Sequence, residues 1–138
     1  MKVALLTVSD SAVNGTREDK SGPTLRSLID SSKTIDAETV ECCLVEDDRD
    51  KIAQILIDLC TRSDVIITTG GTGFAPRDVT PEATLSVIDK RCGGLETALH
   101  MRSLQSTPLA ALSRLCVGIR GHTLIVNLPG STNAVKLM

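Results

Sequence analysis

The sequence predicts an α/β fold, a three-layer α/β/α sandwich built around a mainly parallel sheet. Short apolar runs typical of buried strands alternate along the chain with segments whose apolar residues recur at helical spacing. Polar or glycine-rich segments follow several of these runs, as they do at the carboxyl ends of parallel strands. At 138 residues the chain is large enough for one domain with a real core, so residues 1–138 are expected to form a single domain.

The first strand is predicted at Lys2–Ser9, a short apolar run. A polar loop, Asp10–Lys20, leads to Ser21-Gly22-Pro23, which is typical of a helix start. The second strand is predicted at Ala37–Val45.

The next helix has two candidate caps, Asp47 and Asp48, and its apolar residues again fall at helical spacing. The third strand is predicted at Asp64–Thr69. Two helical segments follow, Pro81–Lys90 and Leu95–Gln105, with a pair of glycines interrupting them.

The last part of the chain holds strand-like pieces at Leu109–Leu112 and Leu115–Ile119 and a clear apolar strand at Thr123–Leu128. Pro129-Gly130-Ser131 then begins another helix, and the sequence stops a few residues later at Met138. Because so short a helix is marginal alone and buries little, we expect the domain to be truncated at its C-terminal helix.

Composition excludes several classes of function. The net charge is −2 with no basic run, and one Phe is the only aromatic residue, so binding of nucleic acid by bulk charge or base stacking is not expected. The five cysteines form no CxxC pair and no even set, which indicates reduced thiols rather than zinc ligands or disulfides. No stretch approaches the roughly 20 apolar residues of a membrane span, and no signal peptide is present, so we expect a cytoplasmic protein.

The most informative segment is TTGGTGFAPRDVTPEAT, Thr68 to Thr84. Gly70, Gly71 and Gly73 give a loop with little side-chain bulk, whose backbone N–H groups can approach a phosphate closely. The loop matches neither GxxxxGK[ST] nor GxGxxG, and the alternative is that the glycines serve only a tight turn. Thr80-Pro81-Glu82 starts a helix with a hydroxyl cap, a proline and an acid, which completes a plausible site for an anionic ligand.

Four segments are expected to converge at the carboxyl edge of the sheet, and they bring three carboxylates together. Two carboxylates about 4 Å apart repel by roughly 4 kcal/mol at an effective dielectric of about 20, so such a cluster recruits a proton or a hard cation. Next to a phosphate-binding loop, Mg²⁺ is the natural cation. The segments are Ser9-Asp10-Ser11, Asp47-Asp48, the glycine loop through Asp78, and Pro129-Gly130-Ser131.

Each carboxylate also has a structural interpretation. Asp47 is a candidate helix cap and Asp10 a candidate turn residue, while Asp78 can pair with Arg77 or organise the helix start at Thr80. Ser113 and Arg114 have no signal of their own. His100 and His122 match no triad or metal pattern, which favours structural or solvated side chains, and Phe74 is expected to pack in its loop.

The chain closely resembles the molybdopterin adenylyltransferases, and especially the G domains of gephyrin-like molybdenum-cofactor proteins. The resemblance covers nearly the whole chain, with the motifs in the family's order. They are TVSDS (7–11), DKSGP (19–23), the glycine segment above, TPLAALSR (107–114), GIRG (118–121) and NLPGS (127–131).

This resemblance implies a homotrimeric enzyme that binds ATP, Mg²⁺ and molybdopterin and transfers AMP onto the terminal phosphate of molybdopterin, releasing pyrophosphate. It implies that Asp47 and Asp78 serve Mg²⁺ binding and catalysis, with Asp10 expected beside them. Further ligand-binding residues are implied at Gly70, Gly71, Thr72, Gly73, Ser113, Pro129, Gly130 and Ser131. A fused or partner molybdate-insertion domain is the implied partner, and the alternative function is a molybdopterin-binding or trimeric scaffold module without turnover.

Two departures from the family stand out. Glu46 replaces a proline that many relatives have before the first aspartate, and the family's long helix after PGS is cut short. The chemistry nevertheless agrees with the residues present. A phosphate oxygen is already an anionic nucleophile at pH 7, so positioning and charge neutralisation suffice and no nucleophile–base pair is required.

Overall fold

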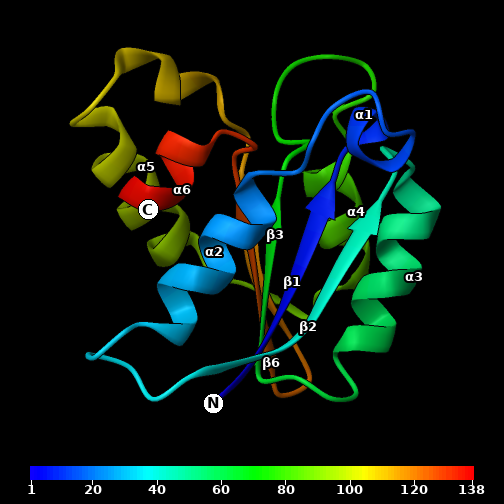
Figure 1. Ribbon diagram of the computed structural model, residues 1–138, viewed down its shortest axis with the longest axis vertical. Helices are drawn as coiled ribbons and strands as arrows, with labels where there is room; N and C mark the ends of the chain where they lie inside the picture. Colours follow the sequence, from blue (N-terminus) through cyan, green and yellow to red (C-terminus); the bar gives the residue numbers. More distant parts are fainter.

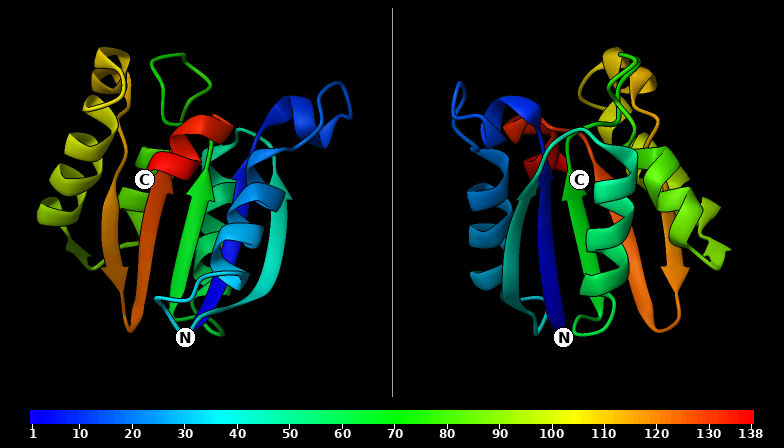
Figure 2. Two further views of the ribbon diagram at one scale, coloured as in Figure 1. Left: turned by 60° about the vertical axis from the view of Figure 1, so that its left-hand side comes forward. Right: turned by 90° about the vertical axis from the view of Figure 1, so that its right-hand side faces the viewer.

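The computed structural model describes residues 1–138 and shows a six-stranded mixed sheet with helices on both faces (Figures 1 and 2). The strand order is β2-β1-β3-β6-β5-β4. The first four in this order are parallel, whereas β5 is antiparallel to β6 and β4 to β5. The strands are β1 (Lys2–Val8), β2 (Glu38–Val45), β3 (Val65–Thr69), β4 (Lys90–Arg91), β5 (Val117–Arg120) and β6 (Thr123–Leu128). The predicted three-layer α/β architecture is confirmed.

Helices α2, α5 and α6 lie on one face of the sheet, and α3 and α4 lie on the other (Figures 1 and 2). The short helix α1 sits at the carboxyl end of β1. The helices are α1 (Asp10–Val13), α2 (Ser21–Asp30), α3 (Arg49–Leu59), α4 (Thr80–Val87), α5 (Gly93–Leu104), the 3-10 helix η1 (Pro108–Leu112) and α6 (Thr132–Leu137).

Strand β1 shows why the apolar runs are continuous rather than alternating. Val3 and Leu5 pack toward α2 and α6, whereas Ala4 and Leu6 pack toward α3 and α4, and all four are at most 2% exposed. A central parallel strand covered by helices on both faces needs apolar residues at every position.

Two hydrophobic cores result. The larger lies between the sheet and helices α3 and α4, and the smaller lies between the sheet and helices α2 and α6. Although α6 has only six residues, it buries Val135 in the smaller core, more than its length suggested.

Two of the predicted elements are wrong in type or extent. The strand expected at Leu109–Leu112 is the 3-10 helix η1, because Pro108 favours a first helical turn and the Thr107 hydroxyl caps it by accepting from the Leu109 N–H at 3.3 Å. The helix expected to reach Lys90 ends at Val87, and Lys90–Arg91 instead form β4 against β5.

The loop predicted at Asp10–Lys20 and the glycine pair at Gly93-Gly94 also differ from expectation. The loop opens with α1, whose first turn is capped by Ser9, which accepts from the Ala12 N–H at 3.2 Å. The glycine pair, expected between two helical segments, is instead the first part of α5. No helix in the structure combines the length and the hydropathy that crossing a membrane requires.

Candidate active site

The predicted segments meet at the carboxyl edge of the parallel strands, where hydrogen bonds join them. The Ser9 N–H donates to Val45 O at 2.8 Å, linking the ends of β1 and β2. The Gly70 N–H donates to Leu128 O at 3.1 Å, and the Thr69 hydroxyl donates to Pro129 O at 2.9 Å. These bonds fix the glycine loop to the turn that follows β6, so the expected convergence is confirmed.

The glycine loop needs glycine at two positions. Gly70 and Gly71 have φ values of +100° and +69°, which side-chain-bearing residues rarely adopt. A Cβ on Gly70 would lie 2.3 Å from the carbonyl oxygen of Val8, and one on Gly71 would lie 2.2 Å from Thr80 Oγ1. Both residues therefore form a tight turn pressed against the end of β1 and the start of α4.

The same loop keeps donors available. The backbone N–H groups of Gly71, Thr72 and Gly73 donate no hydrogen bond within the protein, while Thr80 holds the loop from behind. The Thr80 hydroxyl donates to Gly70 O at 3.0 Å, and the Thr80 N–H donates to Gly71 O at 3.1 Å. The two interpretations of the glycines thus coexist, because the tight turn is what leaves these amides free for an anion.

Two of the predicted aspartates flank this loop. Asp47 Oδ1 lies 3.3 Å from where a Cβ on Gly71 would stand, and Asp78 Oδ2 lies 2.8 Å from the corresponding point on Gly73. Asp78 Oδ2 also accepts a hydrogen bond from the Ala75 N–H at 3.0 Å, closing a turn within the loop. Asp78 forms no ion pair with Arg77, so that structural alternative is wrong.

Asp10 and Asp47 bind each other's backbone. The Asp10 N–H donates to Asp47 Oδ2 at 3.1 Å, and the Asp47 N–H donates to Asp10 Oδ1 at 2.9 Å. Asp48, not Asp47, caps α3 by accepting from the Lys51 N–H at 3.0 Å. Asp47 is therefore not a helix cap, and its Oδ1 has no hydrogen-bond partner in the protein.

The pKa of Asp47 reflects its burial and its acidic neighbours. Burial raises the pKa of Asp47 above its ordinary value, the hydrogen bond from Asp10 opposes this, and the charges of Asp10 and Asp78 raise the pKa further. No three His, Cys, Asp or Glu side chains gather closely enough to hold a metal ion by themselves. The carboxylates available to a cation next to the loop are thus those of Asp47 and Asp78.

Arg114 is the main residue that sequence reasoning missed. Its Nε donates to Gly73 O at 2.8 Å, its Nη2 donates to Asp78 O at 2.7 Å, and its Nη1 pairs with Glu82. Its backbone N–H donates to Thr72 O at 2.8 Å. Arg114 therefore holds both ends of the glycine loop against α4. No local sequence pattern around Arg114 predicts this role.

Ser113 lies against the same loop, as the resemblance implied. Its hydroxyl donates to Thr72 Oγ1 at 3.4 Å, and its carbonyl oxygen is 2.8 Å from His100 Nε2. The interpretation of His100 as a structural side chain fits this contact. Phe74, expected to pack in its loop, is instead 68% exposed.

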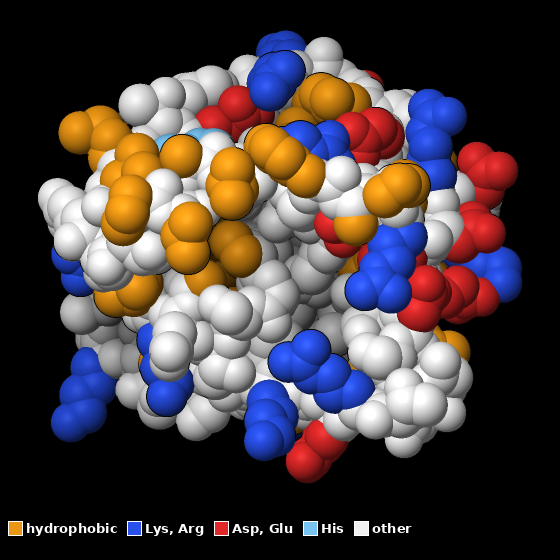
Figure 3. All heavy atoms as spheres, turned by 90° about the horizontal axis from the view of Figure 1, so that it is seen from above, with side chains coloured by type: hydrophobic (Ala, Val, Ile, Leu, Met, Phe, Trp, Pro, Cys, Tyr) orange, Lys and Arg blue, Asp and Glu red, His pale blue; other side chains and the backbone are white.

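Two cavities open at this edge of the molecule and share a wall. The first has a volume of about 550 Å³ and the second about 490 Å³. Both are lined by Gly70, Gly130, Ser131 and Asn133. Seen from above, the molecule is hollowed here, with hydrophobic side chains gathered on one side and basic ones on the other (Figure 3).

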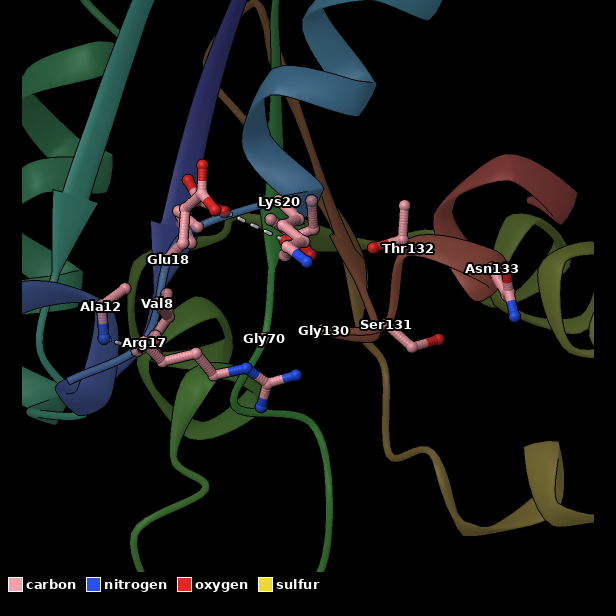
Figure 4. A pocket seen from close by; sticks show the side chains of 15 residues that line it. Val8, Ala12, Arg17, Glu18, Lys20, Gly70, Gly130, Ser131, Thr132 and Asn133 are labelled. Carbon is pink, nitrogen blue, oxygen red and sulfur yellow. Dashed lines mark hydrogen bonds between the residues drawn. The ribbon is translucent and has the colours of Figure 1, made fainter. Parts of the chain in front are cut away.

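The two cavities differ in character. The first is polar and lies between the loop after α1 and the start of α6, with Arg17 and Lys20 among its lining residues (Figure 4). The second contains the predicted ligand residues Gly71, Thr72, Gly73, Asp78, Ser113 and Pro129, and apolar side chains from η1 and α6. Asp10 and Asp47 line neither cavity, although Asp47 lies against Gly71 of the glycine loop.

A second residue that sequence reasoning missed, Asp19, lines the first cavity. Its carboxylate accepts from the Gly22 N–H at 3.0 Å and from the Thr7 hydroxyl at 2.9 Å. Asp19 thus accepts from an N–H group in the first turn of α2, which begins at Ser21 as expected.

The chain is similar to proteins of molybdenum-cofactor biosynthesis. A family described as a probable molybdopterin binding domain matches residues 4–138. A molybdopterin adenylyltransferase of Helicobacter pylori is 39% identical over 97% of this chain and 77% of its own length. The molybdopterin biosynthesis enzyme MoaB of Thermus thermophilus superposes with a TM-score of 0.89 at 40% identity, covering 98% of this chain and 84% of that one.

Two further relatives are much longer than this chain. The molybdenum cofactor synthesis protein cinnamon of Drosophila melanogaster is 48% identical over 96% of the chain, which spans 22% of its length. Gephyrin of Dictyostelium discoideum is 41% identical over 97% of the chain, which spans 20% of its length.

Proposed function

The chain belongs to the family of probable molybdopterin binding domains, and on that premise we propose that it is a molybdopterin adenylyltransferase. Its place is in molybdenum cofactor biosynthesis. The reaction transfers AMP from ATP to the terminal phosphate of molybdopterin and releases pyrophosphate. It is a nucleotidyl transfer between two phosphate-bearing substrates.

The observation that carries this proposal is the shared wall of the two cavities. Each cavity, at about 550 and 490 Å³, has the size of a typical small-molecule site. Gly70 and Gly130 stand between them with backbones in contact, since a Cβ on Gly130 would lie 3.3 Å from Gly70 Cα. Two substrates bound side by side would therefore bring their phosphate groups together at the glycine loop.

The chain's own groups suit phosphate chemistry at that point. The free N–H groups of Gly71, Thr72 and Gly73 can hold phosphate oxygens in fixed positions and stabilise developing negative charge. Arg114 and Thr80 hold the loop in place, so these donors need no rearrangement on binding. The attacking phosphate oxygen is already anionic, which accounts for the lack of a nucleophile–base pair at the site.

The donor set fits the magnesium ion that the resemblance implies. Asp47 Oδ1 and Asp78 Oδ1 accept no hydrogen bond from the protein, and Mg²⁺ is commonly bound by one or two carboxylates together with substrate phosphates. When bound there, the ion would neutralise charge on the phosphates. Asp47 and Asp78 would hold it, and Asp10 would orient Asp47 through the paired hydrogen bonds.

The test is formation of the AMP–molybdopterin adduct from ATP, Mg²⁺ and molybdopterin. We expect Asp78→Asn to reduce the rate by at least about 100-fold, the scale of losing one electrostatic contact in a transition state. Asparagine can still accept from the Ala75 N–H, so the loop should keep its shape. Asp36→Asn removes the same charge at an exposed position away from the cavities and serves as the control. Equal rates for wild type and Asp78→Asn would refute the role of Asp78.

A binding or scaffold module is the alternative, and exposed hydrophobic residues favour assembly. Helix α5 and η1 expose several of them, including Met101 at 61% and Leu109 at 71% (Figure 3). The homotrimer remains a prediction, which light scattering measures. Molybdopterin binding without adduct formation, by a stable trimer, would support the scaffold function and contradict the enzyme.

A further inference from the structure

Arg17 has a cationic side chain that points into the first cavity and has no assigned function. It lies on the segment between α1 and α2, and Gly15, with φ of +79°, bends the chain just before it. Figure 4 shows its guanidinium extended from this segment toward Gly70 and the turn at Gly130 and Ser131. The side chain therefore points toward the wall that the two cavities share.

The guanidinium has no partner in the protein. None of the six ion pairs includes Arg17, and its one hydrogen bond is made by its backbone N–H, which donates to Ser11 O at 3.1 Å. The nearby carboxylate of Asp19 is already held by Gly22 and Thr7. All five N–H donors of the Arg17 guanidinium are thus available to a ligand.

The opposite wall offers donors of the same kind. The backbone N–H groups of Gly130 and Ser131 donate no hydrogen bond within the protein, and those of Gly71 and Thr72 lie next to them along the glycine loop. An anion between the two walls would receive N–H donors from both sides. A guanidinium binds a phosphate with two parallel hydrogen bonds, a geometry that lysine cannot reproduce.

We propose that Arg17 is a substrate-binding residue that holds a phosphate group in the first cavity, opposite the Gly130–Ser131 turn. This inference rests on the proposed function, which supplies two phosphate-bearing ligands, ATP and molybdopterin. The shared chemistry is a phosphate group, and the experiment separates its two sources.

The test is calorimetric titration of the intact chain with ATP, molybdopterin and inorganic pyrophosphate. We expect Arg17→Ala to lower the affinity for the ligand whose phosphate Arg17 holds by about tenfold or more, the effect of losing a charge-assisted hydrogen bond. Arg17→Lys should recover part of the loss, because the charge remains while the paired geometry does not. Lys33→Ala removes one positive charge from an exposed site outside both cavities, and its affinities should equal those of wild type.

The ligands distinguish the outcomes. If Arg17→Ala weakens the binding of ATP and pyrophosphate but not that of molybdopterin, Arg17 binds the nucleotide. The reverse pattern assigns Arg17 to the pterin phosphate. Wild-type affinities for all three ligands in Arg17→Ala overturn the inference, and so does a wild-type chain that binds no pyrophosphate and neither substrate. Substrate binding that depends on Arg17 but yields no AMP–molybdopterin adduct supports the inference and refutes the proposed reaction.

Discussion

Asp10 and Asp47 each donate a backbone N–H to the other's carboxylate, at 3.1 and 2.9 Å. This pair ties the first residue of α1 to a residue just beyond β2, at the edge where the glycine loop begins. It also leaves Asp47 Oδ1 facing Gly71. The hydrogen bonds fix an acid whose burial and acidic neighbours disfavour its charge, which is an arrangement typical of a functional group.

Asp47→Asn should stabilise the fold while removing activity. Because the pKa of Asp47 is raised in the folded protein, the native state retains a proton that the unfolded chain releases. Stability is therefore lost as pH rises from about 3.8 through the folded pKa, and the ionised side chain is a cost at neutral pH. Asparagine avoids that cost and can still accept from the Asp10 N–H.

Melting temperatures of wild type and Asp47→Asn as a function of pH measure this effect. The variant should melt higher at pH 7, and its advantage should shrink as pH falls toward 3.8. Asp48→Asn is the matched control, because asparagine caps α3 about as well as aspartate. A variant that melts lower than wild type at pH 7 would contradict the assignment.

Arg114→Ala should loosen the glycine loop. The change removes hydrogen bonds to Gly73 O and Asp78 O and leaves the Glu82 carboxylate without its partner, which should cost about 1–3 kcal/mol of unfolding free energy. Adduct formation should fall as well, because the loop amides lose their fixed positions.

Denaturant unfolding and adduct formation together test this. Arg114→Lys should recover little, since an ammonium cannot make the three contacts at once. Arg91→Ala breaks an exposed ion pair with Glu96 at the far edge of the sheet and should change stability by about 1 kcal/mol or less. Full activity in Arg114→Ala would show that the loop keeps its shape without the Arg114 side chain.

Asn127→Ala should be among the most destabilising single changes. Asn127 is fully buried, donates to the hydroxyls of Thr68 and Thr84 at 3.0 Å, and accepts from the Cys116 N–H at 3.2 Å. Truncation leaves these groups without partners and opens a cavity, at a cost of about 2–4 kcal/mol. Urea unfolding provides the measurement, and Asn14→Ala, at an exposed position, should cost about 1 kcal/mol or less.

The cysteine thiols should differ in their rates of reaction with a disulfide reagent. Cys42 is exposed, whereas Cys116 is buried. Burial raises the pKa of Cys43 and of Cys116 to about 11, so little thiolate forms at either residue at pH 8. With a disulfide reagent at pH 8, Cys42 should react first and Cys116 only after unfolding. Cys42→Ser should abolish the fast phase. A fast phase that survives this change would contradict the assignment of Cys42 as the most reactive thiol.

How much the sequence predicts depends on whether the signal is local. Continuous apolar runs such as those of β1 and β6 mark strands covered on both faces. The rule that ligands bind at the carboxyl ends of such strands predicted that the glycine loop and the other polar segments converge there. Arg114 was missed because its three partners lie 32 to 41 residues away, so no spacing rule connects them. The hydrophobicity of Leu109–Leu112 predicts a strand. Pro108 and the capping residue Thr107 instead favour a 3-10 helix there.

Asp47 and Asp48 show what the sequence alone cannot distinguish. The sequence places Asp47 and Asp48 equally well at the start of a helix, and only the fold separates them. Asp48 meets the free N–H of α3, while Asp47 turns toward Asp10, 37 residues away.

The contact between Gly70 and Gly130 has a consequence for ligand design. Gly70 and Gly130, two of the four residues that line both cavities, carry no side chains, so a single molecule can extend over them from one cavity into the other. The product of the proposed reaction has that form, a nucleotide joined to a pterin through phosphates. A stable bisubstrate compound of the same length would lose its translational freedom once rather than twice, and it should bind far more tightly than either half.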